Sequence, residues 1–205
     1  IPYIKAELLW YIKGDCYDTS IADKAKIWQD IINRDGTINS NYGAYIFAGP
    51  NQFETVIKTL ANDRDSRRAS MMILNHEHLS SDTKDVPCTY ALNFRIRDNM
   101  LNMSVHMRSQ DAIFGMGNDA PAFSFIHEMM FNALKRHYPD LECGSYFHIA
   151  DSFHAYERHF KMLEKISGID IITKQVVQGH VEDKYQPVEC PRISGPDEVD
   201  FLRKL

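Results

Sequence analysis

The chain has 205 residues, of which 44% are hydrophobic and 25% are charged, and its formal net charge is −5. This length and composition favour one globular domain over residues 1–205 with a substantial core, and they exclude a disordered chain and a coiled coil. The acidic balance argues against a nucleic-acid partner, because nucleic-acid-binding domains usually carry a basic face, so an anionic ligand would have to be held by a local basic cluster.

The N-terminal half of the chain is predicted to hold three helices and one strand. Helical spacing of apolar residues predicts helices over residues 3–13, 24–33 and 52–62. Glu7 falls on or near the apolar face of the first helix. The short apolar run over residues 69–74 is typical of a buried strand.

A hairpin and a long helix follow. Residues 89–97 and 100–107 alternate between apolar and polar side chains, and the two residues between them have the chemistry of a tight hairpin turn. Residues 120–137 carry the apolar spacing of a largely buried helix. We therefore expect a pair of antiparallel strands with a helix packed against it.

The last third is predicted to contain a strand over residues 143–150, a helix over residues 153–166 and a final strand over residues 169–177. Helices and strands follow one another without βαβ regularity. This order predicts an α+β domain in which helices pack on a mixed or antiparallel sheet. The chain begins inside its first predicted helix, which indicates an N-terminal piece outside this numbering.

The cysteines and histidines indicate neither a metal site nor a disulfide framework. The four cysteines lack Cys-x-x-Cys spacing, and the nine histidines show no ligand spacing. No apolar run reaches the roughly 18 residues of a membrane span, and there is no signal segment. We expect a cytoplasmic protein without metal or membrane partner.

Cys88 opens the first strand of the predicted hairpin directly after Pro87, a position that suits a nucleophile at a strand edge. A lone cysteine in a strand is more often a small buried hydrophobic residue. Arg108, at the end of the second strand, can approach across the hairpin, and nearby positive charge lowers the pKa of a thiol. The pair predicts covalent chemistry on an anionic substrate.

Three arginines could form the anion site. Arg67 and Arg68 are adjacent, and a surface basic pair is an equal alternative, but a guanidinium group suits a phosphoryl group better than an ammonium group does. Arg108 adds a third guanidinium group, and Ser109 adds a hydroxyl donor. Together they could neutralise a phosphomonoester.

Two carboxylates have a structural and a functional interpretation. Asp119 follows a glycine turn, where it could cap the next helix or accept hydrogen bonds from an amidine-like edge. Glu7 could be a satisfied core carboxylate or a general acid or base with a raised pKa. His154 and Tyr156, taken alone, suggest capping and packing residues.

Taken together, the motifs closely resemble the thymidylate synthase superfamily over most of residues 1–160, in the order of that family. The matching motifs are Glu7-Leu-Leu-Trp-Tyr-Ile-Lys-Gly-Asp15, Ile27-Trp28, Asn41-Tyr-Gly43, Asp65-Ser-Arg-Arg68, Pro87-Cys88, Arg108-Ser-Gln-Asp111, Phe114-Gly115 and His154-Ala-Tyr156. Four segments look more like the phage deoxycytidylate hydroxymethylases of this superfamily. These segments are Ile38-Asn-Ser-Asn-Tyr-Gly43, Val105-His-Met-Arg-Ser-Gln-Asp111, Gly117-Asn-Asp119 and Tyr156-Glu-Arg-His-Phe160.

The resemblance implies the fold of that family and a covalent mechanism. Cys88 would add to C6 of a pyrimidine nucleotide monophosphate, and C5 would then attack the methylene group of the co-substrate 5,10-methylenetetrahydrofolate. Glu7 would organise proton transfer and water, and Tyr42 would support the region of the cysteine. No metal takes part.

The resemblance also implies which residues bind the substrate and which lie at the folate. The substrate would be held by Arg108, Ser109, Asn93, Asp119, His154 and Tyr156, and by Arg67 and Arg68 from the other subunit of a homodimer. Trp28, Asp111 and Gly115 would lie at the folate. The arginine loop that precedes the first helix in the family is absent from this numbering.

The choice of base depends on the residue that occupies one position. The synthases carry an asparagine where Asp119 matches, and an amide complements uracil, whereas a carboxylate can accept from the N4 amino group of cytosine. A shift of one residue would bring Asn118 to that position and restore uracil. Hydroxymethyl or methyl as the transferred group, and ribose or deoxyribose as the sugar, stay open.

The leading interpretation is a folate-dependent deoxycytidylate hydroxymethylase that supplies a modified nucleotide for phage DNA. The alternatives are a thymidylate synthase or hydroxymethylase acting on dUMP, and a relative that methylates or hydroxymethylates dCMP or CMP at C5. A nucleotide-binding relative without activity would have no need of the Cys88 thiol, and a purely structural domain would leave the arginines unexplained.

Overall fold

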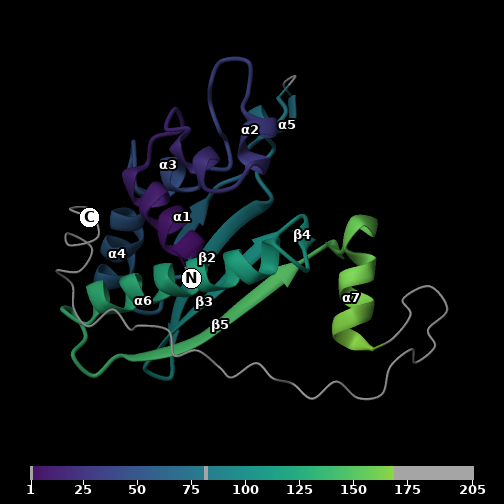
Figure 1. Cartoon of the computed structure of the whole chain (residues 1–205). Helices are drawn as coiled ribbons and strands as arrows, with labels where there is room; N and C mark the ends of the chain where they lie inside the picture. The colour runs from purple at the N-terminus through teal and green to yellow at the C-terminus, as the bar shows by residue number, and fades with distance from the viewer. Residues whose placement is uncertain (1, 81–82, 169–205) are drawn as a thin grey trace.

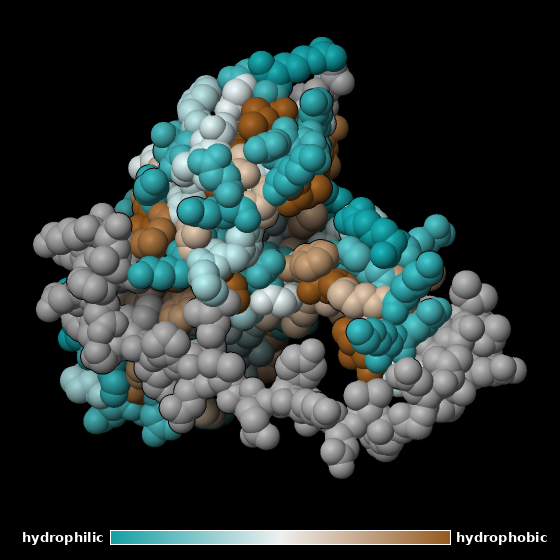
Figure 2. All heavy atoms as spheres, viewed as in Figure 1, coloured by the Kyte–Doolittle hydropathy of each residue, from teal (hydrophilic) through white to brown (hydrophobic). Residues whose placement is uncertain are grey.

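The computed structural model describes residues 2–80 and 83–168, and Figure 1 shows helices packed over a central sheet. The predicted strand 169–177 lies outside the described residues. Within the part of the chain that is described, no helix is long and apolar enough to cross a membrane. Figure 2 shows polar side chains over most of the coloured face in view, with hydrophobic side chains in separate patches.

Three of the N-terminal helices lie where hydrophobic spacing predicts them, and two further short helical segments, over residues 20–23 and 43–46, were not predicted. The elements are α1 (Pro2–Lys13), η1 (Ser20–Asp23), α2 (Ile27–Ile31), α3 (Gly43–Ile46) and α4 (Gln52–Asn62). The predicted helix over residues 24–33 is shorter than expected, because Ile32 leaves the helical region with ψ 126°. Helices α1 and α4 confirm the two strongest apolar patterns.

The main sheet has four strands in the order β1, β2, β3, β5. The strands are β1 (Ser70–Met72), β2 (Thr89–Arg97), β3 (Met100–Met107) and β5 (Glu142–Ala150). The first three strands are antiparallel, and β5 runs parallel to β3. The sheet is therefore mixed, and β1 occupies only three residues of the apolar run 69–74.

The β2–β3 hairpin confirms its prediction and places the two reactive candidates side by side. Asp98 and Asn99 have φ angles of 49° and 62°, as a type I′ turn requires. At the other end of the hairpin Thr89 pairs with Met107. The residues just outside that pair, Cys88 and Arg108, are joined by a hydrogen bond of 2.8 Å from the Arg108 N–H to the Cys88 carbonyl.

Helix α6 (Gly115–Leu134) begins five residues earlier than the predicted helix 120–137, and it ends earlier. The carboxylate of Asp111 accepts the N–H groups of Phe114 and Gly115 at 3.0 and 3.4 Å. This cap compensates for the low helical preference of the glycines that follow. Asp119 consequently lies inside the helix, and the prediction that it begins the helix is wrong.

Short elements complete the chain. They are α5 (His76–Ser80), β4 (Gln110–Asp111), β6 (Phe153–His154), η2 (Glu157–His159) and α7 (Phe160–Ser167). The predicted helix over residues 153–166 therefore begins late, because residues 153 and 154 pair in parallel with β4. Figure 1 shows α7 standing apart from the other helices, beyond β4.

The helices cover one face of the sheet. Helix α6 contacts α1, α4, β3 and β5, and α3 and α4 contact β1. On β5 the side chains alternate between half-buried and exposed, and Phe147 and Ile149 are 44% and 42% exposed. Met72 lies in the same cross-strand row as Ile149 and is 55% exposed. Among residues 2–80 and 83–168, no helix covers the second face of the sheet.

Candidate active site

Arg108 folds back over the segment that carries Cys88. Its Nε and Nη2 donate to the carbonyl oxygens of Pro87 and Val86 at 3.0 and 2.7 Å, and its Nη2 lies 3.7 Å from the Cys88 Sγ. The hairpin register produces this contact, as the sequence predicts. The guanidinium group both shapes the loop and brings positive charge to the thiol.

The pKa of Cys88 is nevertheless raised. Burial of the half-buried thiol raises it, Arg108 opposes the shift, and the carboxylates of Asp119 and Asp85 raise it further. The expectation that positive charge would leave a lowered pKa is therefore wrong for the protein without ligand. Burial of the thiol is the largest contribution to its pKa, and it outweighs the single arginine.

Asp85 ties the Cys88 segment to the loop that carries Tyr42. The Asp85 carboxylate is buried and accepts the Ser40 N–H at 2.7 Å and the Ser40 hydroxyl at 2.5 Å. The side chain of Asn39 donates to the Asp85 carbonyl at 2.9 Å. Two segments more than forty residues apart in the chain are thereby held in one geometry.

Tyr42 lies buried in a stack of aromatic rings. Its ring centroid is 5.4 Å from that of Tyr11 in α1 and 6.0 Å from that of Phe123 in α6, with small interplanar angles. Burial raises the pKa of Tyr42 well above its usual value, and Asp119 and Cys88 contribute to the shift. Tyr42 therefore stays protonated beside the thiol and the carboxylate.

Glu7 is a buried carboxylate at the end of a hydrogen-bond chain. The Tyr3 hydroxyl donates to Glu7 Oε1 at 3.0 Å, and the Trp28 Nε1 donates to the Tyr3 hydroxyl at 2.8 Å. Burial, and then the charge of Asp119, raise the pKa of Glu7 to about 8. At neutral pH Glu7 is mostly protonated, so it can give up a proton at this site.

Asp119, and not Asn118, faces the other candidate groups. Burial raises the pKa of Asp119 to about 6, and its charge in turn raises the pKa values of Glu7 and Cys88. The Asn118 side chain instead donates to the Phe114 carbonyl at 2.7 Å on the outside of α6. The helix geometry therefore separates two neighbours that the sequence could not rank.

A buried relay that sequence reasoning missed reaches Asp119 from the sheet. Gln110 Nε2 donates to Asp119 Oδ2 at 2.9 Å, and Gln110 Oε1 lies 2.8 Å from His148 Nε2. His148 Nδ1 is hydrogen-bonded in turn to the Tyr146 hydroxyl. Gln110 lies within the motif Arg108-Ser-Gln-Asp111, but the sequence contains no signal that places β5 next to it.

His154 and Tyr156 are brought to the loop that follows β3. The strand β6 pairs with β4, so His154 lies beside Asp111, and its carbonyl accepts the Ala112 N–H at 2.8 Å. The rings of His154 and Tyr156 meet edge to face at 5.2 Å. Ser109 directly precedes β4 and is half-buried.

Two of the three residues predicted at the folate, Asp111 and Gly115, lie at the start of α6, whereas Trp28 lies in α2 and donates to the Tyr3 hydroxyl. The backbone N–H groups of residues 113–115 donate to the Asp111 carboxylate. Burial acts to raise the pKa of Asp111, but these hydrogen bonds lower it below its usual value. A Cβ on Gly115 would lie 2.5 Å from Gln110 Nε2, so only glycine leaves room for that amide. Trp28 is buried, with 9% exposure.

Arg67, Arg68 and Asn93 do not join Cys88 within one chain. Both arginines are exposed and precede β1, where Ser70 pairs with Asn93. Asn93 is five residues from Cys88 along the chain, which is about 17 Å at ~3.3 Å per residue. The Asn93 side chain accepts the Ser70 hydroxyl at 2.7 Å.

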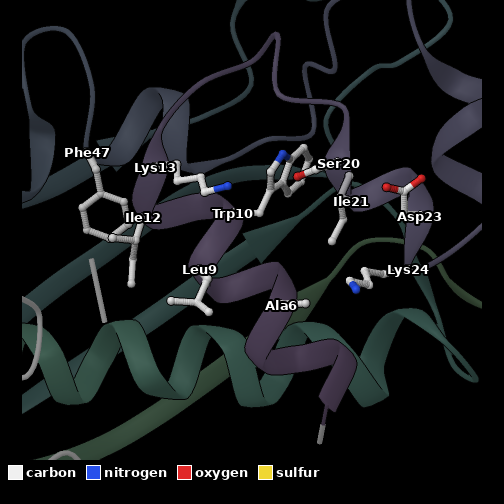
Figure 3. A pocket seen from close by; sticks show the side chains of 10 residues that line it. All are labelled: Ala6, Leu9, Trp10, Ile12, Lys13, Ser20, Ile21, Asp23, Lys24 and Phe47. Carbon is white, nitrogen blue, oxygen red and sulfur yellow. The ribbon is translucent and has the colours of Figure 1, made fainter. Parts of the chain in front are cut away.

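A pocket of about 690 Å³ lies on another part of α1 (Figure 3). Its lining includes Ala6, Leu9 and Lys13, on the face of α1 turned away from Glu7 and Tyr11. None of the predicted site residues lines it.

Among the residues that the structure describes, no three His, Cys, Asp or Glu side chains converge as a metal site would require.

Comparison with known proteins identifies similar chains. The family model described as thymidylate synthase matches residues 1–169. Deoxycytidylate 5-hydroxymethyltransferase of Enterobacteria phage T6 is 31% identical over 171 residues, which cover 79% of this chain and 70% of that protein. Deoxyuridylate hydroxymethyltransferase of Bacillus phage SP01 is 28% identical over 190 residues, with 83% and 48% covered. Thymidylate synthase of Vesicomyosocius okutanii is 25% identical over 172 residues, with 80% and 63% covered.

Proposed function

The chain belongs to the thymidylate synthase family, whose members transfer a one-carbon unit from methylenetetrahydrofolate to a pyrimidine nucleotide, and on this premise we propose that it converts dCMP to 5-hydroxymethyl-dCMP. The relatives that are 31% identical carry that activity in their names. Such a product supplies a modified base for phage DNA. The reaction uses free nucleotides and folate, and we place it in the cytoplasm.

The reaction assigns a role to each group around Cys88. The Cys88 sulfur adds to C6 of the base, which makes C5 a nucleophile. Methylenetetrahydrofolate would supply the carbon at the oxidation level of formaldehyde and leave as tetrahydrofolate. C5 would lose its proton, and elimination of the Cys88 sulfur from C6 would release the product. Glu7, mostly protonated at neutral pH, gives and takes the protons of addition and release, and it orients the water that completes the hydroxymethyl group. Arg108 and Ser109 hold the 5′-phosphate, and His154 and Tyr156 hold the sugar.

The observation that carries the choice of cytosine is the Asp119 carboxylate in the same site as Cys88 and Glu7. A carboxylate oxygen accepts from the N4 amino group of cytosine and repels the O4 oxygen of uracil. Because its pKa is raised to about 6, Asp119 can share a proton with N3 as the thiol adds to C6. The SP01 relative, named for deoxyuridylate, is the reason to keep dUMP as the second candidate.

The rim of the site fits a folate. Phe114, next to Asp111 and Gly115, is 60% exposed, and its ring meets His159 edge to face at 5.1 Å. An exposed, supported aromatic ring offers the flat apolar surface on which a pterin can stack. Among the described residues, none forms a hydrogen bond with the buried Oε2 atom of Glu7, so this atom could bind a polar group of a ligand.

Product analysis tests the proposal directly. The protein is incubated with dCMP or dUMP, each tritiated at C5, and with methylenetetrahydrofolate. We expect tritium release from dCMP and a product heavier by CH2O, the mass of a hydroxymethyl group added in place of hydrogen. Release from dUMP alone, with a gain of CH2, would contradict the proposal and indicate a thymidylate synthase.

We further propose that the protein works as a homodimer in which Arg67 and Arg68 complete the partner's phosphate site. The sheet face that no described helix covers carries exposed Met72, Phe147 and Ile149, apolar side chains of the kind that subunits bury. The two arginines lie next to that face and far from Cys88 of their own chain. A shared interface would explain both features.

Complementation between inactive variants measures this arrangement. Cys88→Ser and the double variant Arg67→Ala, Arg68→Ala are each expected to lose most activity. After mixing and subunit exchange, about a quarter of wild-type activity should return, because half of the dimers are mixed and each has one intact site. If the arginines act within their own chain, neither site of the mixed dimer is intact, and activity stays as low as in each variant alone.

A further inference from the structure

We propose that Tyr146, His148 and Gln110 form a directional hydrogen-bond relay that sets the base preference of the site by determining which oxygen of Asp119 carries a proton. The proposal rests on the proposed function, since it assigns Asp119 to the base. It adds three positioning residues that do not themselves touch the nucleotide. Two of them lie on β5, 36 and 38 residues beyond Gln110 along the chain.

The contacts allow one direction for the relay. His148 Nε2 faces the carbonyl oxygen of Gln110, so it must carry a hydrogen, and His148 Nδ1 must then accept from the Tyr146 hydroxyl. The Gln110 carbonyl is thereby occupied, and its NH2 group points to Asp119 Oδ2. Burial lowers the pKa of His148 and raises that of Tyr146, so both stay neutral in this arrangement.

The surroundings prevent the Gln110 amide from reversing freely. Gln110 is 1% exposed, and the backbone of Gly115 leaves no space for even one additional carbon beside its Nε2. The His148 ring packs against Phe123 of α6 at 6.4 Å. A reversed amide would place its carbonyl oxygen against the Asp119 carboxylate, which is unfavourable in a buried site, and it would require the His148 hydrogen to move from Nε2 to Nδ1.

The direction of the relay has a consequence for the ligand. Because Asp119 Oδ2 accepts from Gln110, a proton shared with Asp119 is directed to Oδ1. A carboxyl group held in this way presents one donor and one acceptor in a fixed order. In the cytosine order, the donor of the carboxyl group faces N3 and its acceptor faces the N4 amino group. In the reverse order, the acceptor faces the N3–H of uracil and the donor faces O4. A relay that keeps one order therefore discriminates between the bases, and we assign it the cytosine order.

The test compares dCMP with dUMP in four variants, using the ratio of their kcat/KM values and, separately, of their dissociation constants. His148→Leu removes the donor to Gln110 and should move the ratio toward one by about tenfold, the effect of one lost buried hydrogen bond. His148→Gln restores an N–H near the position of Nε2 and should recover most of the ratio. Tyr146→Phe should act in the same direction as His148→Leu, but less strongly.

Tyr138→Phe is the matched control, because its hydroxyl makes a comparable bond of 2.8 Å to the Leu60 carbonyl away from the site. It should leave the ratio unchanged. An unchanged ratio in His148→Leu, or an equal loss for both nucleotides in His148→Leu and His148→Gln, would overturn the relay. Thermal unfolding of each variant identifies a folding defect, and Tyr146→Phe then decides the result, because it deletes only one oxygen atom.

The failure of the relay and the failure of the proposed function have different signatures. If the wild-type protein prefers dUMP, the cytosine assignment is wrong, but the relay itself still predicts movement of the ratio toward one in His148→Leu. If wild type prefers dCMP and the ratio does not respond, the relay alone is wrong. Binding of neither nucleotide would overturn both.

Discussion

Replacement of Cys88 by serine is expected to reduce turnover by at least about a thousandfold, because a hydroxyl group is a far weaker nucleophile than a thiol toward C6. Burial already raises the pKa of Cys88, and Arg108 alone offsets part of that shift. A serine hydroxyl, with a much higher pKa, would not ionise there. The measurement is the initial rate of tritium release from dCMP together with nucleotide affinity by calorimetry.

Nucleotide binding should change little in Cys88→Ser, since the phosphate contacts come from arginine side chains. Arg108 keeps its bonds to the Pro87 and Val86 carbonyls, so the loop should retain its shape. Cys16→Ser serves as the control, because Cys16 is half-buried like Cys88 but belongs to a different loop. Turnover that survives in Cys88→Ser would remove the covalent mechanism.

Asp119→Asn is expected to move the preference from dCMP toward dUMP by about a hundredfold or more. An amide can accept from N3–H and donate to O4 of uracil, while it leaves the hydrogen-bonding groups of cytosine poorly matched in a buried site. Loss of the negative charge should also bring the raised pKa values of Glu7 and Cys88 down. The measurement is kcat/KM for both nucleotides in wild type and variant.

Asn118→Asp is the paired control, because it adds a carboxylate at the neighbouring position while Asp119 stays in place. The Asn118 side chain bonds to the Phe114 carbonyl outside the site, so the base preference should stay within about twofold, in line with other substitutions away from buried contacts. A change of preference in Asn118→Asp, combined with none in Asp119→Asn, would mean that the base lies on the other side of α6.

Much of the fold follows from local signals. Alternation and the Asp98-Asn99 turn predicted the β2–β3 hairpin to the residue, and the hairpin in turn predicted the meeting of Cys88 and Arg108. The predictions failed where local preference met tertiary contacts. Glycines marked the start of α6 as a turn, but the Asp111 cap makes it helical, and pairing with β4 holds residues 153 and 154 in a strand.

The sequence by itself determined the family, the α+β class and the candidate set around Cys88, because these depend on residue types, their order and short-range periodicity. The tertiary structure alone decided that Asp119 rather than Asn118 enters the site, because one step along a helix turns a side chain by about 100°. It also decided that Gln110 meets His148 across 38 residues of chain. The parallel placement of β5 beside β3 is a long-range pairing, and the sequence contains no local signal for it.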